Sequence, residues 1–257
     1  MRRVTVIETV ERENNNTITV RFRDDLCVMP GQFYMVWFPP INEIPLSVSY
    51  NGKLKGVTVK GIGKSTKKIV EGAVGDVISL DGPYGNYFKP YGNKILAIAG
   101  GVGIASIILA IESFHSMGLD ITTIIGAKKY DELIFMERAN ISSDTFIVTT
   151  DDGSYGEKGF TVNIAEKLIA EKKFDSIITC GPEIMMKKIV DISLKSNIKV
   201  YASIERIMKC AIGICDSCVF GAYHICMDGP IFTGEQLKDI PDFGKWKHGF
   251  SGEKIKL

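Results

Sequence analysis

Four cysteines near the C-terminus, Cys210, Cys215, Cys218 and Cys226, have the type and spacing that could bind metal. The first three are separated by four and then by two residues, which is the plant-type spacing of a [2Fe-2S] cluster, in which every ligand is an ionised sulfur. Gly213 permits the tight turn that such a loop needs, and buried amides can then donate hydrogen bonds to the cluster sulfurs. The pattern predicts a [2Fe-2S] cluster held by these four thiolates.

Zinc and disulfides are the alternatives for these cysteines. A structural zinc site usually takes paired Cys-x2-Cys units, and the separation of Cys210 from Cys215 is too wide for one. Clustered cysteines in a chain that lacks a signal peptide favour a metal site over a disulfide framework. His224 is close enough in sequence to replace a cysteine, as in a Rieske centre, but four thiolates already suffice. We therefore expect His224 to be an ordinary loop residue.

Composition and charge limit the classes of function. The 257 residues are 45% apolar and 24% charged, as in ordinary globular proteins, and the length allows two domains. A formal net charge of +1 gives no electrostatic footprint for nucleic acid or for an anionic membrane. The longest apolar run, 95–111, is broken by glycines and too short to span a bilayer, and the N-terminus lacks the apolar core of a signal peptide. We expect a cytoplasmic protein with no membrane insertion and no nucleic-acid partner.

The segment 1–92 shows short strand signals separated by turns. Such strands at this spacing predict a small antiparallel barrel or sandwich, here a six-stranded barrel, with about one helical turn near 65–70. The expected strands are 4–10, 17–22, 33–38, 46–50, 56–61 and 76–80.

The segment 93–203 alternates strands with helices. Apolar runs bounded by Gly, Asp and Ser, with helices between them, predict a parallel sheet covered on both faces. The regular pattern stops at Glu205, so 204–257 forms a small third part around the cysteines. The expected strands are 95–99, 121–127, 145–150, 176–180 and 200–203, and the expected helices are 104–114, 161–171 and 184–196.

Glycine-rich or polar turns follow three of these buried strands. Loops at the carboxyl ends of parallel strands bind ligands, and glycines let a phosphate approach the backbone at a helix N-terminus. The first turn lacks the full G-x-G-x-x-G fingerprint, so tight strand-helix packing explains it equally well. Cys180 is a reactive thiol or a buried residue at a strand end. The candidate nucleotide-binding residues are Gly100, Gly101, Val102 and Gly103, then Asp151, Asp152 and Gly153, then Cys180, Gly181 and Pro182.

Two stretches of the first segment could also bind a cofactor. In the strand Pro45, Leu46, Ser47, Val48 and Ser49, the two hydroxyls lie on one face and could bond a flat polar ring, although any half-exposed strand shows such alternation. The turn Gly63, Lys64, Ser65 and Thr66 opens a helix, so its amides could hold a pyrophosphate, and the alternative is a plain helix cap.

In this order the three parts resemble the ferredoxin-NADP reductase superfamily, and most closely the electron-transfer subunits of type B dihydroorotate dehydrogenases. The resemblance covers essentially the whole chain. It is carried by the motifs 45–47, 63–66, 81–86, 100–103, 150–154 and 180–182, and above all by 203–206 leading into the cysteine loop, then 226–232.

The resemblance implies the cofactors and their places. The strand at Ser47 would contact the isoalloxazine ring of FAD, and the turn at Gly63 would hold its pyrophosphate. The loops at Gly100, Asp151 and Gly181 would bind NAD, with NADP possible, and the four cysteines would ligate the cluster. Electrons would pass from the FMN of a catalytic subunit through [2Fe-2S] and FAD to NAD+ in pyrimidine biosynthesis. No side chain of this chain would act as acid or base, and the complex would be a heterotetramer of two copies of each subunit.

The chain departs from the family pattern at the flavin motif. Ile44 stands where the family has an arginine that pairs with the pyrophosphate, and Ser65 replaces a glycine. Losing a charge-assisted contact costs roughly 1.5–3 kcal/mol, so FAD would be held weakly, by Lys60, Lys64 or Lys67, or be replaced by a smaller flavin. The short gap between Cys218 and Cys226 implies a trimmed hairpin rather than a lost ligand.

Two alternatives to this function follow from the same residues. The module could serve a hydrogenase, a sulfide dehydrogenase or a ferredoxin-NAD(P) reductase complex, but some of those relatives have Asp as first cluster ligand, and Cys210 favours the pyrimidine enzyme. The other alternative is a non-redox nucleotide-binding protein with a structural zinc loop.

Overall fold

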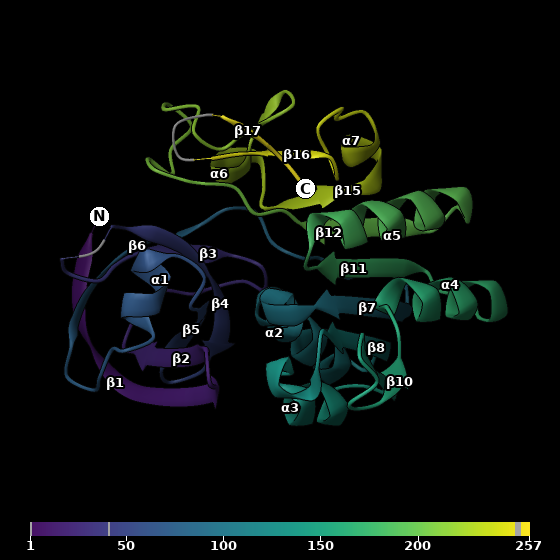
Figure 1. Cartoon of the computed structure of the whole chain (residues 1–257), viewed down its shortest axis with the longest axis horizontal. Helices are drawn as coiled ribbons and strands as arrows, with labels where there is room; N and C mark the ends of the chain where they lie inside the picture. The colour runs from purple at the N-terminus through teal and green to yellow at the C-terminus, as the bar shows by residue number, and fades with distance from the viewer. Residues whose placement is uncertain (1, 41, 250–252) are drawn as a thin grey trace.

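The computed structural model describes residues 2–40, 42–249 and 253–257, and it has three parts (Figure 1). An N-terminal barrel lies on the left of the view, an α/β part lies on the right, and the C-terminal segment lies above both. The expected order of a barrel, a parallel sheet and a C-terminal metal-binding segment is confirmed.

The barrel closes because its first strand is long enough to pair with two neighbours. The N-terminal residues of β1 pair with β6, and from Ile7 onward β1 pairs with β2 across a register shift. Alternate side chains such as Ile18, Val20 and Phe22 fill the interior. The strands follow the order β1-β2-β5-β4-β3-β6 and are β1 (Arg3–Asn14), β2 (Thr17–Phe22), β3 (Phe33–Trp37), β4 (Ile44–Asn51), β5 (Lys55–Lys60) and β6 (Val77–Tyr84), with the short helix α1 (Lys64–Ile69) after β5.

The α/β part is a sheet in the order β10-β9-β8-β7-β11-β12-β15, parallel except for β15. Along β7, Ile95 and Ala97 share a core with α2 and α3, whereas Leu96 and Ile98 share a core with α4 and α5. Both faces are therefore covered, which explains the unbroken apolar runs. The strands are β7 (Lys94–Gly100), β8 (Asp120–Ala127), β9 (Thr145–Thr150), β10 (Glu157–Lys158), β11 (Ser176–Cys180) and β12 (Lys199–Ser203), and the helices are η1 (Gly101–Gly103), α2 (Ile104–Ser116), η2 (Tyr130–Glu132), α3 (Met136–Ile141), α4 (Thr161–Glu171) and α5 (Glu183–Lys195).

The C-terminal segment is more regular than its sequence pattern indicates. Strand β15 pairs antiparallel with β12, so the chain returns from the cysteine loop to the edge of the sheet. The tail after the cysteine loop shows no period in the sequence because its elements are too short to produce one. They are β13 (Val219–Phe220), β14 (Tyr223–His224), α6 (Ile225–Asp228), β15 (Ile231–Thr233), α7 (Gly234–Lys238), β16 (Trp246–His248) and β17 (Lys254–Lys256).

The helices of the α/β part are short. Among the helices in the described part of the chain, none is long and apolar enough to cross a membrane.

Candidate functional site

Strand β4 of the barrel packs across helix α2 of the α/β part. The Ser47 and Ser106 hydroxyl oxygens lie 3.0 Å apart, and the Arg138 guanidinium donates a hydrogen bond of 2.9 Å to the Ser49 carbonyl. The strand that carries the Ser47 motif is therefore fixed against the helix that follows the glycine turn.

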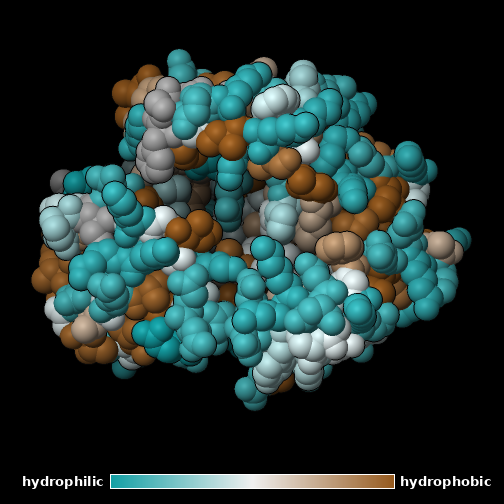
Figure 2. Space-filling view, in the orientation of Figure 1, coloured by the Kyte–Doolittle hydropathy of each residue, from teal (hydrophilic) through white to brown (hydrophobic). Residues whose placement is uncertain are grey.

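A cavity of about 530 Å³ opens where the three parts meet, and we call it the barrel pocket. Figure 2 shows the surface hollowed between the barrel, the α/β part and the C-terminal segment. Its volume is in the usual range for a small-molecule site. The side chains that line it include Pro45, Leu46 and Ser47 from β4, Thr66 from α1, Val102 and Ser106 from the α/β part, and Glu205, Arg206, Lys247 and Ile255 from the C-terminal segment.

A second cavity of about 400 Å³, the sheet pocket, lies at the carboxyl ends of β7, β8 and β9. This is the edge of an open parallel sheet at which ligands bind. Lys60 lines both cavities, so the two pockets are neighbours. The residues that line it include Gly100, Gly101, Gly126, Lys128, Thr149, Asp151, Pro182 and Met185.

The glycines at this edge have two different roles. Gly101 has a φ of +54° and open space around its Cα, so the backbone faces the sheet pocket without a side chain. A Cβ at Gly103 would lie 2.5 Å from the Cys180 carbonyl oxygen. Gly103 therefore allows tight packing between the helix and β11, and Gly100 allows close packing against Pro182 and Met185, whereas Gly101 leaves room for a ligand.

The cysteine loop folds back on itself after β12. Ala211, Gly213 and Asp216 have positive φ angles, which wraps the backbone around the sulfurs. A Cβ at Gly213 would lie 2.9 Å from Cγ of Met227, so glycine is required there for space as well as for conformation. The amide of Ile212 donates to Sγ of Cys210 at 3.5 Å.

The four sulfurs gather as two pairs. The Cys210 side chain contacts that of Cys215, and the Cys226 side chain contacts that of Cys218. Among the described residues, no three His, Cys, Asp or Glu side chains come close enough to hold one metal ion. Two such pairs suit a cluster in which each of two irons takes two cysteines. The residues present therefore fit a [2Fe-2S] cluster.

Local hydrogen bonds prepare one of these thiols for ionisation. Burial opposes ionisation of Cys210, but bonds from the amides of Ile212, Ile214 and Cys215 outweigh it and lower its pKa to about 6. Burial and the contact with Cys218 raise the pKa of Cys226 to about 12.

An ion pair joins the cysteine segment to the α/β part. Arg206 donates to both carboxylate oxygens of Glu183, at 2.6 and 3.0 Å, and its guanidinium lies 4.2 Å from the centre of the Phe220 ring. The two charged side chains are 5% and 8% exposed, so the pair is buried. The amide of Gly244 also donates to Glu183. This pair fixes the start of the loop beside the barrel pocket.

The comparisons with known proteins agree with one another. A family model for the iron-sulfur cluster binding domain of dihydroorotate dehydrogenase B matches residues 205–238. The probable dihydroorotate dehydrogenase B (NAD(+)) electron transfer subunit of Methanocaldococcus jannaschii is 46% identical, over 97% of this chain and 96% of that protein. Its counterpart in Thermoplasma acidophilum is 40% identical, over 100% of this chain and 99% of that protein. The chain belongs to the family of dihydroorotate dehydrogenase B electron transfer subunits.

Solved structures place this family member in the expected superfamily. The structure of an NADH-dependent reduced ferredoxin-NADP oxidoreductase, studied for flavin-based electron bifurcation, has a TM-score of 0.81 and 30% identity, over 90% of this chain and 88% of that chain. A ferredoxin reductase of carbazole 1,9a-dioxygenase shares the fold alone, with a TM-score of 0.66 and 16% identity over 77% of this chain and 66% of that chain. The predicted resemblance and the redox class of the subunit are confirmed.

Several residues predicted to bind cofactors have side chains engaged with other parts of the protein. The Ser49 hydroxyl lies 2.8 Å from that of Thr58, which itself lines the barrel pocket. Val48 packs in the barrel core. The Thr66 hydroxyl accepts bonds from the amides of Ile62 and Gly63, so it caps α1. Two amides at the proposed pyrophosphate turn therefore already have a partner.

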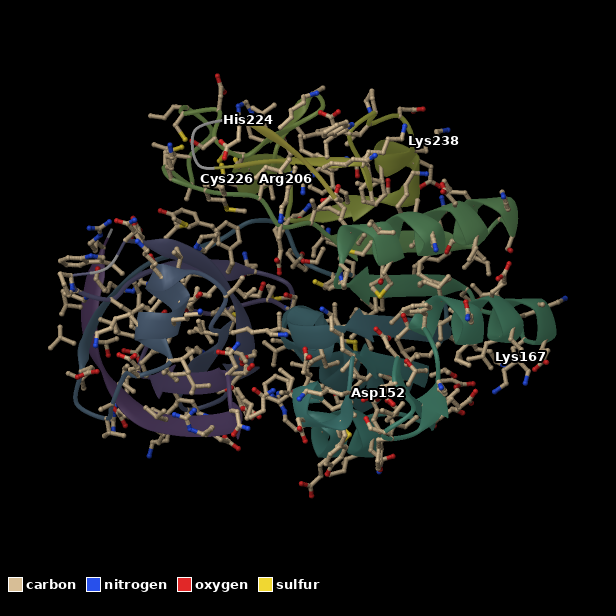
Figure 3. All side chains as sticks on the ribbon, in the orientation of Figure 1. Asp152, Lys167, Arg206, His224, Cys226 and Lys238 are labelled. Carbon is tan, nitrogen blue, oxygen red and sulfur yellow. The ribbon has the colours of Figure 1, made fainter. Side chains whose placement is uncertain are left out.

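The residues predicted to bind nucleotide after β9 also differ in whether they line a cavity. Asp151 lines the sheet pocket, but Asp152 and Gly153 are exposed in the turn beyond it. Figure 3 shows Asp152 in the α/β part, well away from Arg206, His224 and Cys226 in the C-terminal segment. The His224 ring lies 2.7 Å from a carboxylate oxygen of Asp216. The histidine is thus engaged at the surface of the loop.

Cys180 has the environment of a structural thiol. It is 1% exposed, and this burial raises its pKa to about 12, while the hydroxyls of Ser106 and Ser203 contact its sulfur. A thiol that stays protonated is a poor nucleophile.

Sequence reasoning missed Glu205 as a pocket residue. Glu205 lines the barrel pocket and is exposed to solvent there. The protein groups nearby raise the pKa of its carboxyl, and Arg206 opposes this shift. The motif 203–206 was recognised in the sequence. Two adjacent charged residues do not indicate, however, that Glu205 lines a cavity while Arg206 pairs with a buried carboxylate.

Proposed function

We propose that this chain carries electrons between the catalytic subunit of a dihydroorotate dehydrogenase and NAD+, with a [2Fe-2S] cluster and FAD as its own cofactors. The observation that supports this most directly is the order of its sites. Glu205 and Arg206 lead from the barrel pocket into the cysteine loop, and Lys60 lies between the barrel pocket and the sheet pocket. A one-electron site, a cavity for a flavin and a cavity for a dinucleotide are thus adjacent in the order that electron transfer requires.

Each site has residues suited to its cofactor. Cys210, Cys215, Cys218 and Cys226 hold the cluster. Ser47 and its neighbours in β4 face the flavin ring, and Gly100, Gly101, Asp151 and Pro182 are positioned for NAD+. The names of the relatives specify NAD(+), which favours it over NADP.

The flavin supplies the exchange between one-electron and hydride chemistry when it is bound. The protein positions the cofactors relative to one another. The contacts Ser47–Ser106 and Ser49–Arg138 fix the barrel against the α/β part, so the two cavities keep their separation. No side chain has to gain or lose a proton for this reaction. The binding residues therefore act by orienting rings and excluding water.

The catalytic subunit binds at the cysteine loop in this proposal, and the complex contains two copies of each subunit. Ile212, Ile214 and Met227 are exposed by 52%, 76% and 57% around the loop. Large apolar side chains grouped at the surface are typical of a protein interface. A reducing compartment, the cytoplasm, would keep the loop thiols available for iron.

An anaerobic spectrum tests the proposal. The protein is purified without oxygen, iron and sulfide are counted, and visible absorption is recorded before and after addition of NADH. We expect flavin and cluster bands that bleach with NADH. A colourless protein that contains zinc after cofactor reconstitution would exclude electron transfer and favour the non-redox alternative.

A second candidate is a reductase subunit for another NAD(P)H-linked complex. The 30% identity to the ferredoxin-NADP oxidoreductase structure over most of both chains favours it. Mixing the purified chain with the dihydroorotate dehydrogenase catalytic subunit of the same organism separates the two. Dihydroorotate-dependent reduction of NAD+ by the mixture, absent from either subunit alone, supports the pyrimidine enzyme.

A further inference from the structure

The C-terminal hairpin forms one wall of the barrel pocket. In the pairing of β16 with β17, Lys247 lies opposite Ile255, so their side chains share one face of the hairpin. Lys247, Gly249 and Ile255 all line the barrel pocket. Residues 247 and 249 are two positions apart and therefore lie on the same face, and residue 255 is the cross-strand partner of 247. All three positions thus place this face of the hairpin toward the cavity.

Short-range contacts order the described strands of the hairpin. The amides of Lys245 and Trp246 both donate to the Asp242 carbonyl at 3.0 Å, and Nζ of Lys254 lies 3.1 Å from the Asp242 carboxylate. The amide of Leu257 donates to the Lys245 carbonyl at 3.0 Å. These contacts tie β16 and β17 to each other and to the turn at Asp242.

The cations that line the barrel pocket differ in their partners. Nζ of Lys60 lies 2.9 Å from a carboxylate oxygen of Glu132, and Arg206 is held by both oxygens of Glu183. Lys247 has no carboxylate within ion-pair distance among residues 2–40, 42–249 and 253–257. Its ammonium group is therefore the pocket cation that remains available to a ligand.

We propose that Lys247 contacts a phosphate of the flavin in the barrel pocket, and that Ile255 covers an apolar part of the same ligand. The inference rests on the proposed function, because it assumes that this pocket holds FAD. The phosphates are the negative groups of FAD, and lysine acts on phosphate as a point charge. Ile44 leaves β4 without a cation at the edge of the pocket, and Lys247 supplies one from the other end of the chain.

Flavins with and without phosphate test this contact. We would measure dissociation constants of FAD and riboflavin by flavin fluorescence for the wild type, Lys247→Ala, Lys247→Arg and Lys256→Ala. Lys256 pairs with Trp246 on the opposite face of the same hairpin, so it is the matched control for charge and fold. Lys247→Ala should bind FAD about tenfold more weakly, whereas Lys247→Arg should restore binding. Riboflavin should bind all four proteins equally, and Lys256→Ala should match the wild type for both flavins.

Two results would overturn the assignment. One is an unchanged dissociation constant of Lys247→Ala for FAD. The other is an equal loss for riboflavin, which would mean that the substitution disturbs the wall of the pocket rather than a phosphate contact. Iron content measured on every variant reports whether the cysteine loop has folded. Failure of the wild type itself to bind any flavin would instead refute the proposed function.

Discussion

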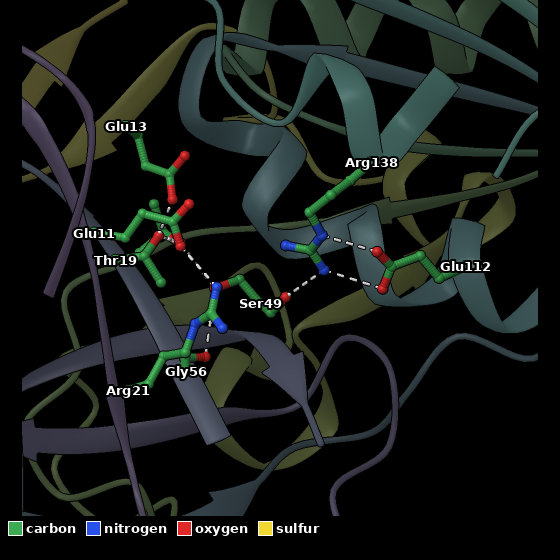
Figure 4. Close-up of polar contacts among 9 residues, drawn as sticks. Glu11, Glu13, Thr19, Arg21, Ser49, Gly56, Glu112 and Arg138 are labelled. Carbon is green, nitrogen blue, oxygen red and sulfur yellow. Dashed lines mark hydrogen bonds and ion pairs between the residues drawn. The ribbon is translucent and has the colours of Figure 1, made fainter. Parts of the chain in front are cut away.

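The Arg138 guanidinium of the α/β part stacks on the Tyr50 ring of the barrel, with its central carbon 3.8 Å from the ring centre. Arg21 stacks on the same ring at the same distance, and because two guanidinium groups cannot share one face so closely, Tyr50 lies between them. Figure 4 shows Arg138 bonded to both carboxylate oxygens of Glu112 and to the Ser49 carbonyl. This stack fixes the orientation of the barrel to the α/β part.

Replacing the central cation should loosen that junction. Arg138→Met removes the stack on Tyr50, the paired bonds to Glu112 and the bond to the Ser49 carbonyl. We expect a loss of about 1.5–3 kcal/mol in the free energy of unfolding, measured with urea. Arg138→Lys should lose less, since it keeps the charge without the planar fork. The control Arg23→Met lies in a mostly exposed pair and should leave stability almost unchanged. Equal stability of Arg138→Met and Arg23→Met would contradict the assigned role of the stack.

We predict that substituting a cysteine of the loop removes the cluster, whereas substituting either of the other two cysteines does not. Cys226→Ser should lose most of its iron and labile sulfide, because it removes a thiolate from one of the two sulfur pairs. Cys27→Ser and Cys180→Ser should retain both, since Cys27 is exposed in the barrel and Cys180 is buried at the end of β11. Metal and sulfide analysis of anaerobically purified proteins measures this, and full iron in Cys226→Ser would remove that residue from the ligand set.

The buried ion pair makes a stability prediction. Glu183→Gln leaves the Arg206 charge buried without a carboxylate and should cost about 3–5 kcal/mol. The double variant Glu183→Met/Arg206→Met should be less destabilised than the single one, because it buries no unpaired charge. Glu71→Gln, in an exposed pair with Lys68, is the control and should cost less than about 1 kcal/mol. A double variant less stable than Glu183→Gln would show that lost packing, and not an unpaired charge, dominates the loss of stability.

Cys180 should make the protein sensitive to alkali. Its pKa rises from 9.0 to about 12 on folding, so the folded state favours the neutral thiol. That contribution is complete below pH 9 and is lost as pH rises from 9 toward 12. Between pH 9 and pH 10 the wild type should lose about 1 kcal/mol more than Cys180→Ala, whose cavity lowers stability at every pH. Parallel curves for the two proteins over this range would refute the shift.

Short-range patterns predicted most of the architecture. The barrel strands and the parallel strands follow from alternation and from continuous apolar runs, and the cysteines reveal a metal loop because three of them lie in one local turn. Strand β15 was missed because its apolar run has too few residues, and the β16–β17 hairpin because each of its strands has only three residues.

The candidate site was harder to predict because its walls come from distant parts of the chain. Ser47 and Ser106 approach each other across two parts, and Lys60 lies between two cavities. The sequence around Gly103 is the same whether the glycine admits a phosphate or packs against a carbonyl, and the three-dimensional structure distinguishes these roles.

The cysteine loop leaves and rejoins the sheet at one point. Ser203 at the end of β12 pairs with Ile231 at the start of β15, and the next amide, that of Ile204, donates to the Pro230 carbonyl at 2.9 Å. The loop can therefore change in length without altering the register of β12 and β15, and this junction offers engineers a place to graft a different redox centre.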